Sequence, residues 1–329
     1  MNASGRAAFT CCGRFGREAG ITLTEMLVTL VIFTVVGSIV FSLYNSSAKL
    51  ISADQGRVNT NQNLRTSLDL MTQDLRQAGE SLSTQYSISG VDFAPATGLT
   101  VRKGVTLPVL SVCQTFNGAV SSILVTGQPS DSSTIPAQCS YSDAGGPVSP
   151  TTPNGITDKV DPWMTYQAQA GHATIPAILY NPVTKLVSRV VINGVTNTAV
   201  GGVLTSTLNL VSNVNATAFS WSSGSVVVPV DERRYYLVAD ELRFIANEDP
   251  ATIQALGYGL SAMTFTATTV VGAAPPVTTV YPTFAIDSPW KSVSRVDLSL
   301  SGSNTVTGSR AVARTLSVSV YPRNVLQSR

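Results

Sequence analysis

The chain has 329 residues, of which 43% are hydrophobic and only 12% are charged, with a formal net charge of +2 and four cysteines. Sparse charge, together with abundant Ser, Thr, Val, Ala and Gly, favours a β-rich exported domain over a cytosolic helical enzyme. The near-neutral balance excludes the basic footprint of a nucleic-acid-binding protein.

Residues 1–20 form a basic leader, whose positive charges are Arg6, Arg14 and Arg17. Positive segments beside a membrane span stay in the cytoplasm, so the chain after Ala48 is expected outside. Without this leader the chain has 18 basic and 18 acidic residues, since the leader takes three of 21 and one of 19. We therefore treat the leader as a separate segment.

An apolar run follows the sequence Gly20-Ile21-Thr22-Leu23-Thr24-Glu25. No charged residue occurs from Met26 to Ala48, and Lys49 ends the run. This is long enough to cross a bilayer as a helix, which needs about 20 mostly apolar residues. Glu25 stands at the entrance, and an ionisable residue in such a place is a functional hypothesis by default. The alternative is a carboxylate that only reaches back to the lipid headgroups.

The segment around Gly20 resembles the processing site of type IV prepilins and type II secretion pseudopilins. It shares their basic flank, the Gly before an apolar residue, and the Glu at the fifth position after that Gly. In that family a membrane peptidase cuts after the Gly and methylates the new terminal amine. The resemblance implies cleavage between Gly20 and Ile21, N-methylation of Ile21, and an assembly role for the Glu25 carboxylate. That carboxylate would take the ammonium of its own chain or of a neighbour; Ile21 departs from the family's usual Phe.

An ordinary secretory signal peptide is the other interpretation of this segment. Its apolar core usually has about 7–15 residues and ends at a small-residue cleavage site. Ser46-Ser47-Ala48 offers such a site. The apolar run is longer than that core, and Glu25 interrupts its start.

A second periodic segment continues the helix beyond Lys49. Apolar side chains recur there at spacings of four and three: Leu64, Leu68, Met71, Leu75 and Ala78. This pattern predicts an amphipathic helix, with Gly79 as its C-cap. We expect one nearly continuous helix from about Thr22 to Ala78, membrane-spanning over 21–48 and packed on its own domain over 49–79. A coiled coil is the alternative, but the stripe covers only about two heptads.

Residues 80–329 are expected to form a β-rich exported head. Short runs rich in β-branched residues alternate there with Gly, Pro, Asn and Ser. The alternation in 293–300 and 313–320 predicts a hairpin joined through 301–310, and 143–158 is expected to be a surface loop. The predicted strands are 105–112, 121–126, 177–180, 185–192, 204–211, 225–230, 234–239, 242–246, 260–269, 278–284, 293–300 and 311–321.

Three short pieces resemble the PilW group of minor pilins. They are 74–79 at the helix end, the paired segments 235–238 and 241–244, and 318–324 near the C-terminus. The resemblance touches both ends of the chain and is weak from 81 to 224. The alternative for 74–79 is a simple capped helix end with Arg76 near the C-terminal dipole.

The cysteines fall on both sides of the predicted membrane span. Cys11 and Cys12 lie in the leader, whereas Cys113 and Cys139 lie in the exported part, where disulfides form. A Cys113–Cys139 disulfide would contribute about 3–4 kcal/mol on the chain-entropy model. The alternative is two buried free thiols.

Residues with catalytic or metal-binding potential are few. His172 is the only histidine, which excludes a histidine zinc cluster, and we interpret it as a surface or turn residue. Residues 257–262 match a dinucleotide fingerprint loosely but lack a βαβ context, so they predict a turn entering a strand.

Residues 231–234 are interpreted as a solvated hairpin end. Asp240 and Glu241 suggest calcium, which needs six to eight oxygen ligands. We predict no enzyme activity, cofactor or metal.

The sequence thus predicts an α+β, pilin-like chain whose long N-terminal helix packs on an antiparallel β-rich head. The resemblance implies a minor type IV pilin that helps to initiate the pilus and supports adhesion, twitching motility or DNA uptake. It implies other pilins, the prepilin peptidase, the inner-membrane assembly platform and the lipid bilayer as partners. It implies a bacterial inner-membrane location with a periplasmic head, and then the pilus at the cell surface. The alternatives are a J-type pseudopilin of type II secretion, and an exported hydrolase or binding protein.

Overall fold

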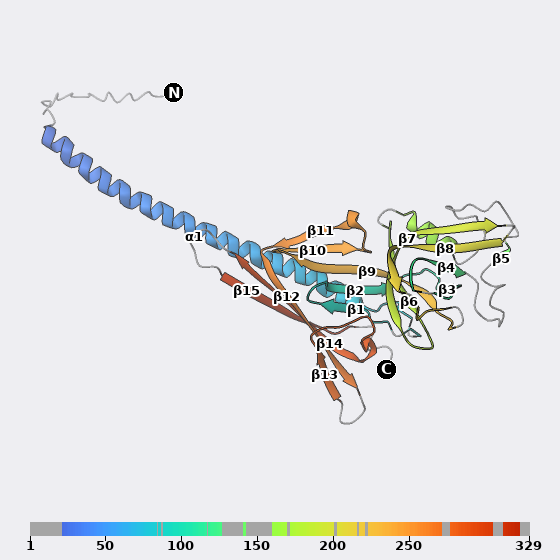
Figure 1. Ribbon diagram of the computed structural model, residues 1–329. Coiled ribbons are helices and arrows are strands. Elements are labelled where there is room, and N and C mark those ends of the chain that lie inside the picture. The colour runs from blue at the N-terminus through green and yellow to red at the C-terminus, as the bar shows by residue number, and fades with distance from the viewer. Residues whose placement is uncertain are drawn as a thin grey trace, which may run out of the picture. The chain divides into compact units, whose positions relative to one another are not determined.

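The computed structural model describes residues 22–83, 85–86, 88–116, 118–126, 141–142, 160–169, 172–200, 203–215, 217–220, 223–271, 277–304 and 312–322. The chain divides into two compact units, Met1–Gln55 and Gly56–Arg329. The helices and strands of both units are labelled in Figure 1.

Helix α1 covers Leu23–Gln77, a run of 55 residues. The predicted helix from Thr22 to Ala78 is therefore confirmed to within one residue at each end. It ends where Gly79 adopts a φ of +77°, and the Gly79 N–H donates to the Arg102 carbonyl at 2.8 Å. A left-handed residue just after the last turn is the usual glycine stop, as predicted.

The part of α1 in the second unit buries the predicted apolar stripe. Leu64, Met71 and Leu75 are fully buried, and Leu68 is 6% exposed. Their side chains share one core with buried residues from two sheets, among them Tyr235 and Leu298. The period of the stripe thus identified the face of α1 that packs on the head.

Five antiparallel strands form the first sheet region of this core, in the order β1-β2-β9-β10-β11. Their bounds are β1 Val91–Ala94, β2 Gly98–Gly104, β9 Val226–Val238, β10 Glu241–Ala246 and β11 Gln254–Tyr258. The 3-10 turn η1, Pro250–Thr252, joins β10 to β11. The predicted pairing of 235–238 with 241–244 is confirmed, since Leu237 lies opposite Leu242.

A separate four-stranded antiparallel sheet covers the same core, in the order β13-β12-β14-β15. Its strands are β12 Leu260–Val271, β13 Val277–Tyr281, β14 Val293–Asn304 and β15 Val312–Val320, and the turn η2 is Trp290–Ser292. The predicted final hairpin is confirmed, because Leu298 lies opposite Val318 and Leu300 opposite Leu316. Residues 257–262 form the end of β11, a turn at Gly259 and the start of β12, as expected.

A ring of six antiparallel strands forms the other half of the head. The order β9-β3-β4-β8-β7-β6 closes because β6 pairs back to β9. The added strands are β3 Leu110–Val112, β4 Ala119–Thr126, β6 Ile175–Tyr180, β7 Val187–Val200 and β8 Val203–Asn215, with β5 Tyr141–Ser142 beside β8. Helix α2, Asp161–Gln167, contributes Trp163, which is fully buried and donates from Nε1 to the Pro108 carbonyl at 2.9 Å. This closed barrel has an apolar core of its own.

Strand β9 corrects one prediction. We expected two strands, 225–230 and 234–239, separated by a solvated hairpin end at 231–234. They form one continuous strand, and Glu232 in the middle is 1% exposed. Glu232 can be buried there because Arg102, on the neighbouring strand β2, is a fully buried partner of opposite sign. Strands β1, β2, β5 and β11 and helix α2 were not predicted, and 143–158 lies outside the described residues.

Replacement of Gly79 by alanine should destabilise the head. An alanine at this position would have to keep the left-handed φ, which costs about 1–2 kcal/mol. Its Cβ would also lie 2.5 Å from Trp290 Nε1, and this overpacking adds about 1–3 kcal/mol. We expect a loss of about 2–5 kcal/mol in the free energy of unfolding, measured by urea denaturation of residues 56–329 expressed alone.

Gly118→Ala is the matched control for this prediction. Gly118 has a φ of +99°, but a Cβ there meets nothing within 4 Å, so only the backbone term of about 1–2 kcal/mol applies. Equal losses in the two variants would show that contact with Trp290 does not matter.

Candidate functional site

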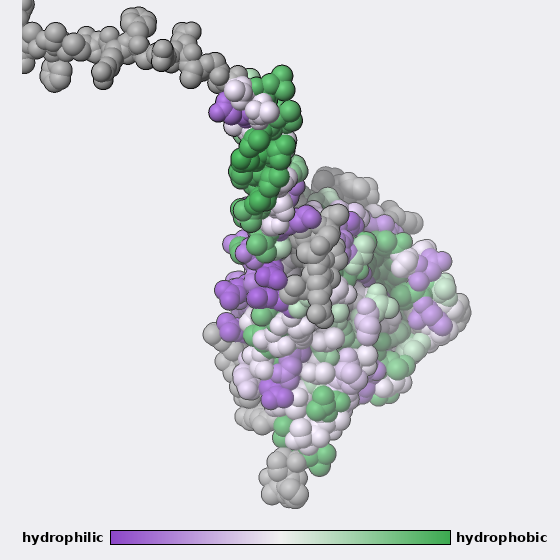
Figure 2. Space-filling view, turned by 90° about the vertical axis from the view of Figure 1, so that its left-hand side faces the viewer, coloured by the Kyte–Doolittle hydropathy of each residue, from purple (hydrophilic) through white to green (hydrophobic). Residues whose placement is uncertain are grey.

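The first half of α1 exposes apolar side chains on every face. Figure 2 shows this half as a green surface on the side turned to the viewer, and large exposed side chains run from Leu23 to Ile51. The most apolar 18-residue window has a mean hydropathy of 2.5 and no residue buried. A helix that is apolar all round needs lipid or other apolar helices around it. Among the described residues, α1 is the one helix long and apolar enough to cross a membrane.

Four hydroxyl groups in this half bond to the backbone of the same helix. An unsatisfied hydroxyl would be costly in an apolar medium. Four of them donate to a carbonyl oxygen three or four residues earlier: Thr29 to Glu25 at 2.9 Å, Thr34 to Val31 at 2.8 Å, Ser38 to Val35 at 2.8 Å and Ser46 to Ser42 at 2.9 Å. These residues are therefore compatible with hydrocarbon surroundings.

Glu25 takes part in a capping box with Thr22. The Thr22 N–H and the Thr22 hydroxyl both donate to Glu25 Oε2 at 3.0 Å, and the Glu25 N–H donates to Thr22 Oγ1 at 3.4 Å. The first helical hydrogen bond follows, from the Met26 N–H to the Thr22 carbonyl at 3.2 Å. This arrangement satisfies backbone donors at the helix start. The cap at Thr22 was not predicted, although the spacing Thr-x-x-Glu is its signature.

The other predicted site residues are only partly described. Gly20 and Ile21 lie outside the described residues, so cleavage, methylation and an ammonium partner for Glu25 stay predictions. Cys113 lies directly after β3, where its N–H donates to the Leu124 carbonyl at 2.8 Å. Cys139 lies outside the described residues, and the disulfide likewise stays a prediction.

A buried ion cluster lies where β9 passes from the barrel into the open sheet. Arg102 on β2 is fully buried, and its Nε donates to Glu232 Oε1 at 2.6 Å. Arg189 on β7 donates from Nη2 to Glu232 Oε2, also at 2.6 Å. Burial alone would raise the pKa of Glu232, but the attraction of the two guanidinium groups outweighs it and lowers that pKa. The cluster joins a barrel strand to the sheet on which α1 packs.

A second polar contact ties α1 to β9. Asp74 on α1 is buried and accepts from Tyr235 OH at 2.5 Å and from Arg233 Nη1 at 2.8 Å. Burial and the nearby Asp74 charge raise the pKa of Tyr235, so it remains a neutral donor. The segment 74–79 therefore does more than cap the helix, because Asp74 fixes the rotation of α1 on the sheet.

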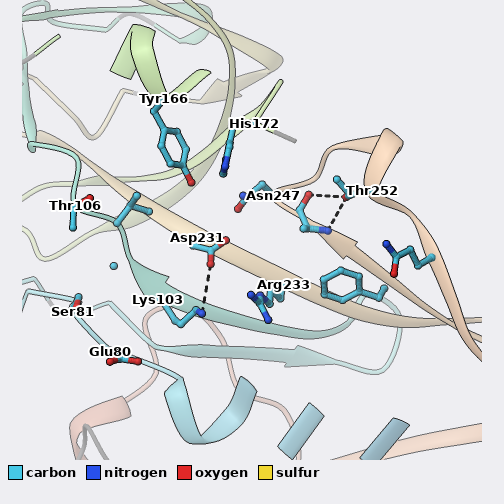
Figure 3. Close-up of a pocket in the computed structure, with 15 residues that line it drawn as sticks. Glu80, Ser81, Lys103, Thr106, Tyr166, His172, Asp231, Arg233, Asn247 and Thr252 are labelled. Carbon is cyan, nitrogen blue, oxygen red and sulfur yellow. Dashed lines mark hydrogen bonds and ion pairs between the residues drawn. The ribbon is translucent and has the colours of Figure 1, made fainter. Parts of the chain in front are cut away.

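A pocket of about 720 Å³ opens beside these contacts. Figure 3 shows Tyr166 and His172 on one side of it, and Lys103, Asp231 and Arg233 on the other. His172 is half-buried, with its ring centroid 4.0 Å from that of Tyr166. The only histidine thus lines a cavity, which its expected place at a surface turn did not suggest.

The described residues hold no group of three or more His, Cys, Asp or Glu side chains that could bind a metal ion. Of the two residues considered for calcium, Asp240 lies in the turn after β9 and Glu241 is the first residue of β10. Glu241 accepts from Arg243 Nη2 at 2.8 Å. The carboxylate of Glu241 is therefore already paired with Arg243.

Comparison with known proteins identifies no relative: no protein-family model, no curated protein and no solved structure matches this chain.

Glu232→Gln should destabilise the head strongly at neutral pH. The variant keeps the shape of the side chain but removes the anion that contacts the buried Arg102 at 2.6 Å and leaves only the longer contact with Asp92 at 3.3 Å. Breaking a buried ion pair in this way costs about 3–5 kcal/mol. The control is Glu241→Gln, whose partner Arg243 lies at the surface, where such a pair contributes at most about 1 kcal/mol. Denaturant unfolding of residues 56–329 measures both, and equal effects would contradict the role of the buried cluster.

The stability gap between wild type and Glu232→Gln should depend on pH. The folded-state pKa of Glu232 lies below its ordinary value of 4.5, so its contribution is fully present above that value. The contribution is lost as the pH falls through the folded-state pKa. We expect the gap to be constant from pH 7 to about pH 5 and to narrow below it. A gap that stays constant down to pH 3 would show that Glu232 does not titrate in this way.

Proposed function

We propose that this chain is a minor type IV pilin of the PilW kind, processed by a prepilin peptidase and built into a pilus through its N-terminal helix. Its function is assembly: it helps to initiate the fibre and carries the β-rich head outward, in support of adhesion, twitching motility or DNA uptake. The single observation that supports this most is the change of surroundings along α1. Apolar side chains are exposed on every face before Gln55, and a buried stripe follows from Leu64.

This change fits a subunit that moves from a bilayer into a fibre. In both places the first half of α1 is surrounded by apolar groups, either lipid or the same helix of other subunits. The stripe and the contact from Asp74 to Tyr235 and Arg233 keep the second half on its own head throughout. One element can therefore link the head to an assembly without a flexible linker in between.

Glu25 supplies the polar contact that such packing needs. Within the chain its carboxylate accepts from the Thr22 N–H and hydroxyl, which keeps it satisfied before assembly. After cleavage at Gly20, the ammonium of Ile21 on the same or a neighbouring subunit becomes a stronger partner, because both groups are charged. A carboxylate in apolar surroundings then favours the register in which it meets an ammonium.

Secretion by an ordinary signal peptidase fits less well. Cleavage after Ala48 would fall inside α1, which runs without a break from Leu23 to Gln77. It would also remove the longest apolar surface of the chain, which would then serve only for export. A prepilin cut before Ile21 leaves the whole helix on the mature protein.

Substitutions at Glu25 separate capping from assembly. Glu25→Gln keeps a side chain that can complete a capping box but removes the negative charge, whereas Glu25→Val removes both. We expect both variants to be processed and held in the membrane, and both to be depleted about tenfold or more from sheared pili relative to wild type, since a charge-assisted contact contributes about 1.5–3 kcal/mol. Immunoblots of membrane and sheared fractions measure this.

The control is Thr22→Val, which weakens the cap but keeps the charge. We expect it to cost about 1 kcal/mol at the helix start and to enter pili nearly as wild type. If Glu25→Gln enters pili normally while Thr22→Val does not, the carboxylate acts through the cap and the proposed assembly role is wrong. Recovery of wild type with a secretion pseudopilus instead of pili would point to the J-type alternative.

A further inference from the structure

The pocket beside β9 is lined by five segments of the chain. They are the residues just after α1, the end of β2 with the turn after it, α2 with His172, the middle of β9, and β10 with the turn that leads into β11. Its volume of about 720 Å³ falls within the range of about 300–1,000 Å³ typical of ligand sites. The assembly role proposed above makes no use of this pocket.

The charges in the pocket balance and are largely engaged. Lys103 lies 3.7 Å from Asp231 and also donates to Gln77 Oε1 at 3.2 Å. Arg233 is held by Asp74 at 2.8 Å, and the remaining charge is Glu80 at the rim. Two cations against two anions leave no surplus charge for an ionic ligand.

The neutral polar groups, in contrast, are available. His172 Nδ1 is buried and has no hydrogen-bond partner among the described residues. Asn247 is 4% exposed and accepts the Glu232 N–H on its Oδ1 at 2.9 Å. Its amide nitrogen keeps two donors without a partner in the described part of the chain. A buried polar atom without a partner is uncommon and calls for an explanation.

Tyr166 completes this set of groups. Its hydroxyl is directed into the pocket beside His172 in Figure 3. Burial and the charge of Asp231 raise the pKa of Tyr166 to about 12, so the hydroxyl stays neutral and can both donate and accept. The rings of Tyr166 and Phe244 add apolar surface to the lining. Neutral donors and acceptors thus lie next to aromatic rings, with no free charge among them.

We propose that this pocket binds a neutral saccharide through His172, Asn247 and Tyr166. A sugar ring carries hydroxyls that donate and accept on its rim, and C–H groups that give it an apolar face. Those are the two kinds of surface that the pocket offers. Asp231, already held by Lys103, can accept from a sugar hydroxyl as well, because a carboxylate has about four lone-pair sites. The inference is independent of the pilin assignment, since it rests on the head alone.

Saturation-transfer NMR on the full-length chain tests this proposal. The chain is kept in lauryldimethylamine oxide micelles, a detergent without sugar or phosphate. The neutral probes are glucose, galactose, N-acetylglucosamine, lactose and cellobiose, and the charged probes are glucuronate and inorganic phosphate. Phosphate has no carbon-bound proton, so its binding is measured by the broadening of its phosphorus-31 signal. We expect at least one neutral probe to bind in preference to both charged ones.

Two variants place the bound probe in the pocket. His172→Phe keeps the ring packed on Tyr166 and removes the unpartnered nitrogen, so we expect unchanged or higher thermal stability and about tenfold weaker sugar binding. Tyr166→Phe should weaken binding to a similar extent. Tyr258→Phe, which removes an exposed hydroxyl outside this pocket, should bind as wild type. Binding that neither pocket variant weakens, a preference for glucuronate or phosphate, or no binding of any probe would overturn the proposal.

Discussion

Water is an unfavourable solvent for the first half of α1. Large apolar side chains cover it from Leu23 to Ile51, and none of them is buried within the chain. Transfer of each one into an apolar environment is worth about 1.5–3 kcal/mol, which sums to tens of kcal/mol. The backbone is already satisfied as a helix, and the hydroxyls of Thr29, Thr34 and Ser38 bond to it. The capped carboxylate of Glu25 is then the one charged side chain described before Lys49 that must find a partner or remain near the lipid headgroups.

The head has two parts with separate cores. One part packs against the second half of α1, and the other is the closed barrel. Strand β9 belongs to both parts, and Figure 1 shows it running from the barrel into the sheet beside α1. Its two faces carry different contacts. Glu232 faces Arg102 and Arg189, whereas Arg233 and Tyr235 reach Asp74 on the helix. A force applied to α1 is therefore transmitted to β9 by polar contacts as well as by the apolar stripe.

The parts of the fold that could be predicted are those that depend on local pattern. The spacing of apolar residues predicted the stripe from Leu64 to Ala78, and Gly79 predicted the end of the helix. The alternation of apolar and polar residues predicted the hairpin of β14 and β15. Closure of the barrel could not be predicted, because the pairing of β6 with β9 joins segments about 50 residues apart through backbone hydrogen bonds. The burial of Glu232 could not be predicted for the same reason, since its partners Arg102 and Arg189 come from distant strands. The cap at Thr22 was also missed, but for a different reason. It has a local signature, Thr-x-x-Glu, and could have been predicted from the sequence.

The most direct test of an assembling N-terminal helix is the mass of the N-terminal peptide of the mature protein. The chain would be purified from the membranes of cells that contain an active prepilin peptidase, and its terminal peptide sequenced by mass spectrometry. We expect it to begin at Ile21, with or without one added methyl group on the amine. A chain that still begins at Met1 would contradict processing, and one that begins at Lys49 would mean that the apolar half of α1 is an export signal.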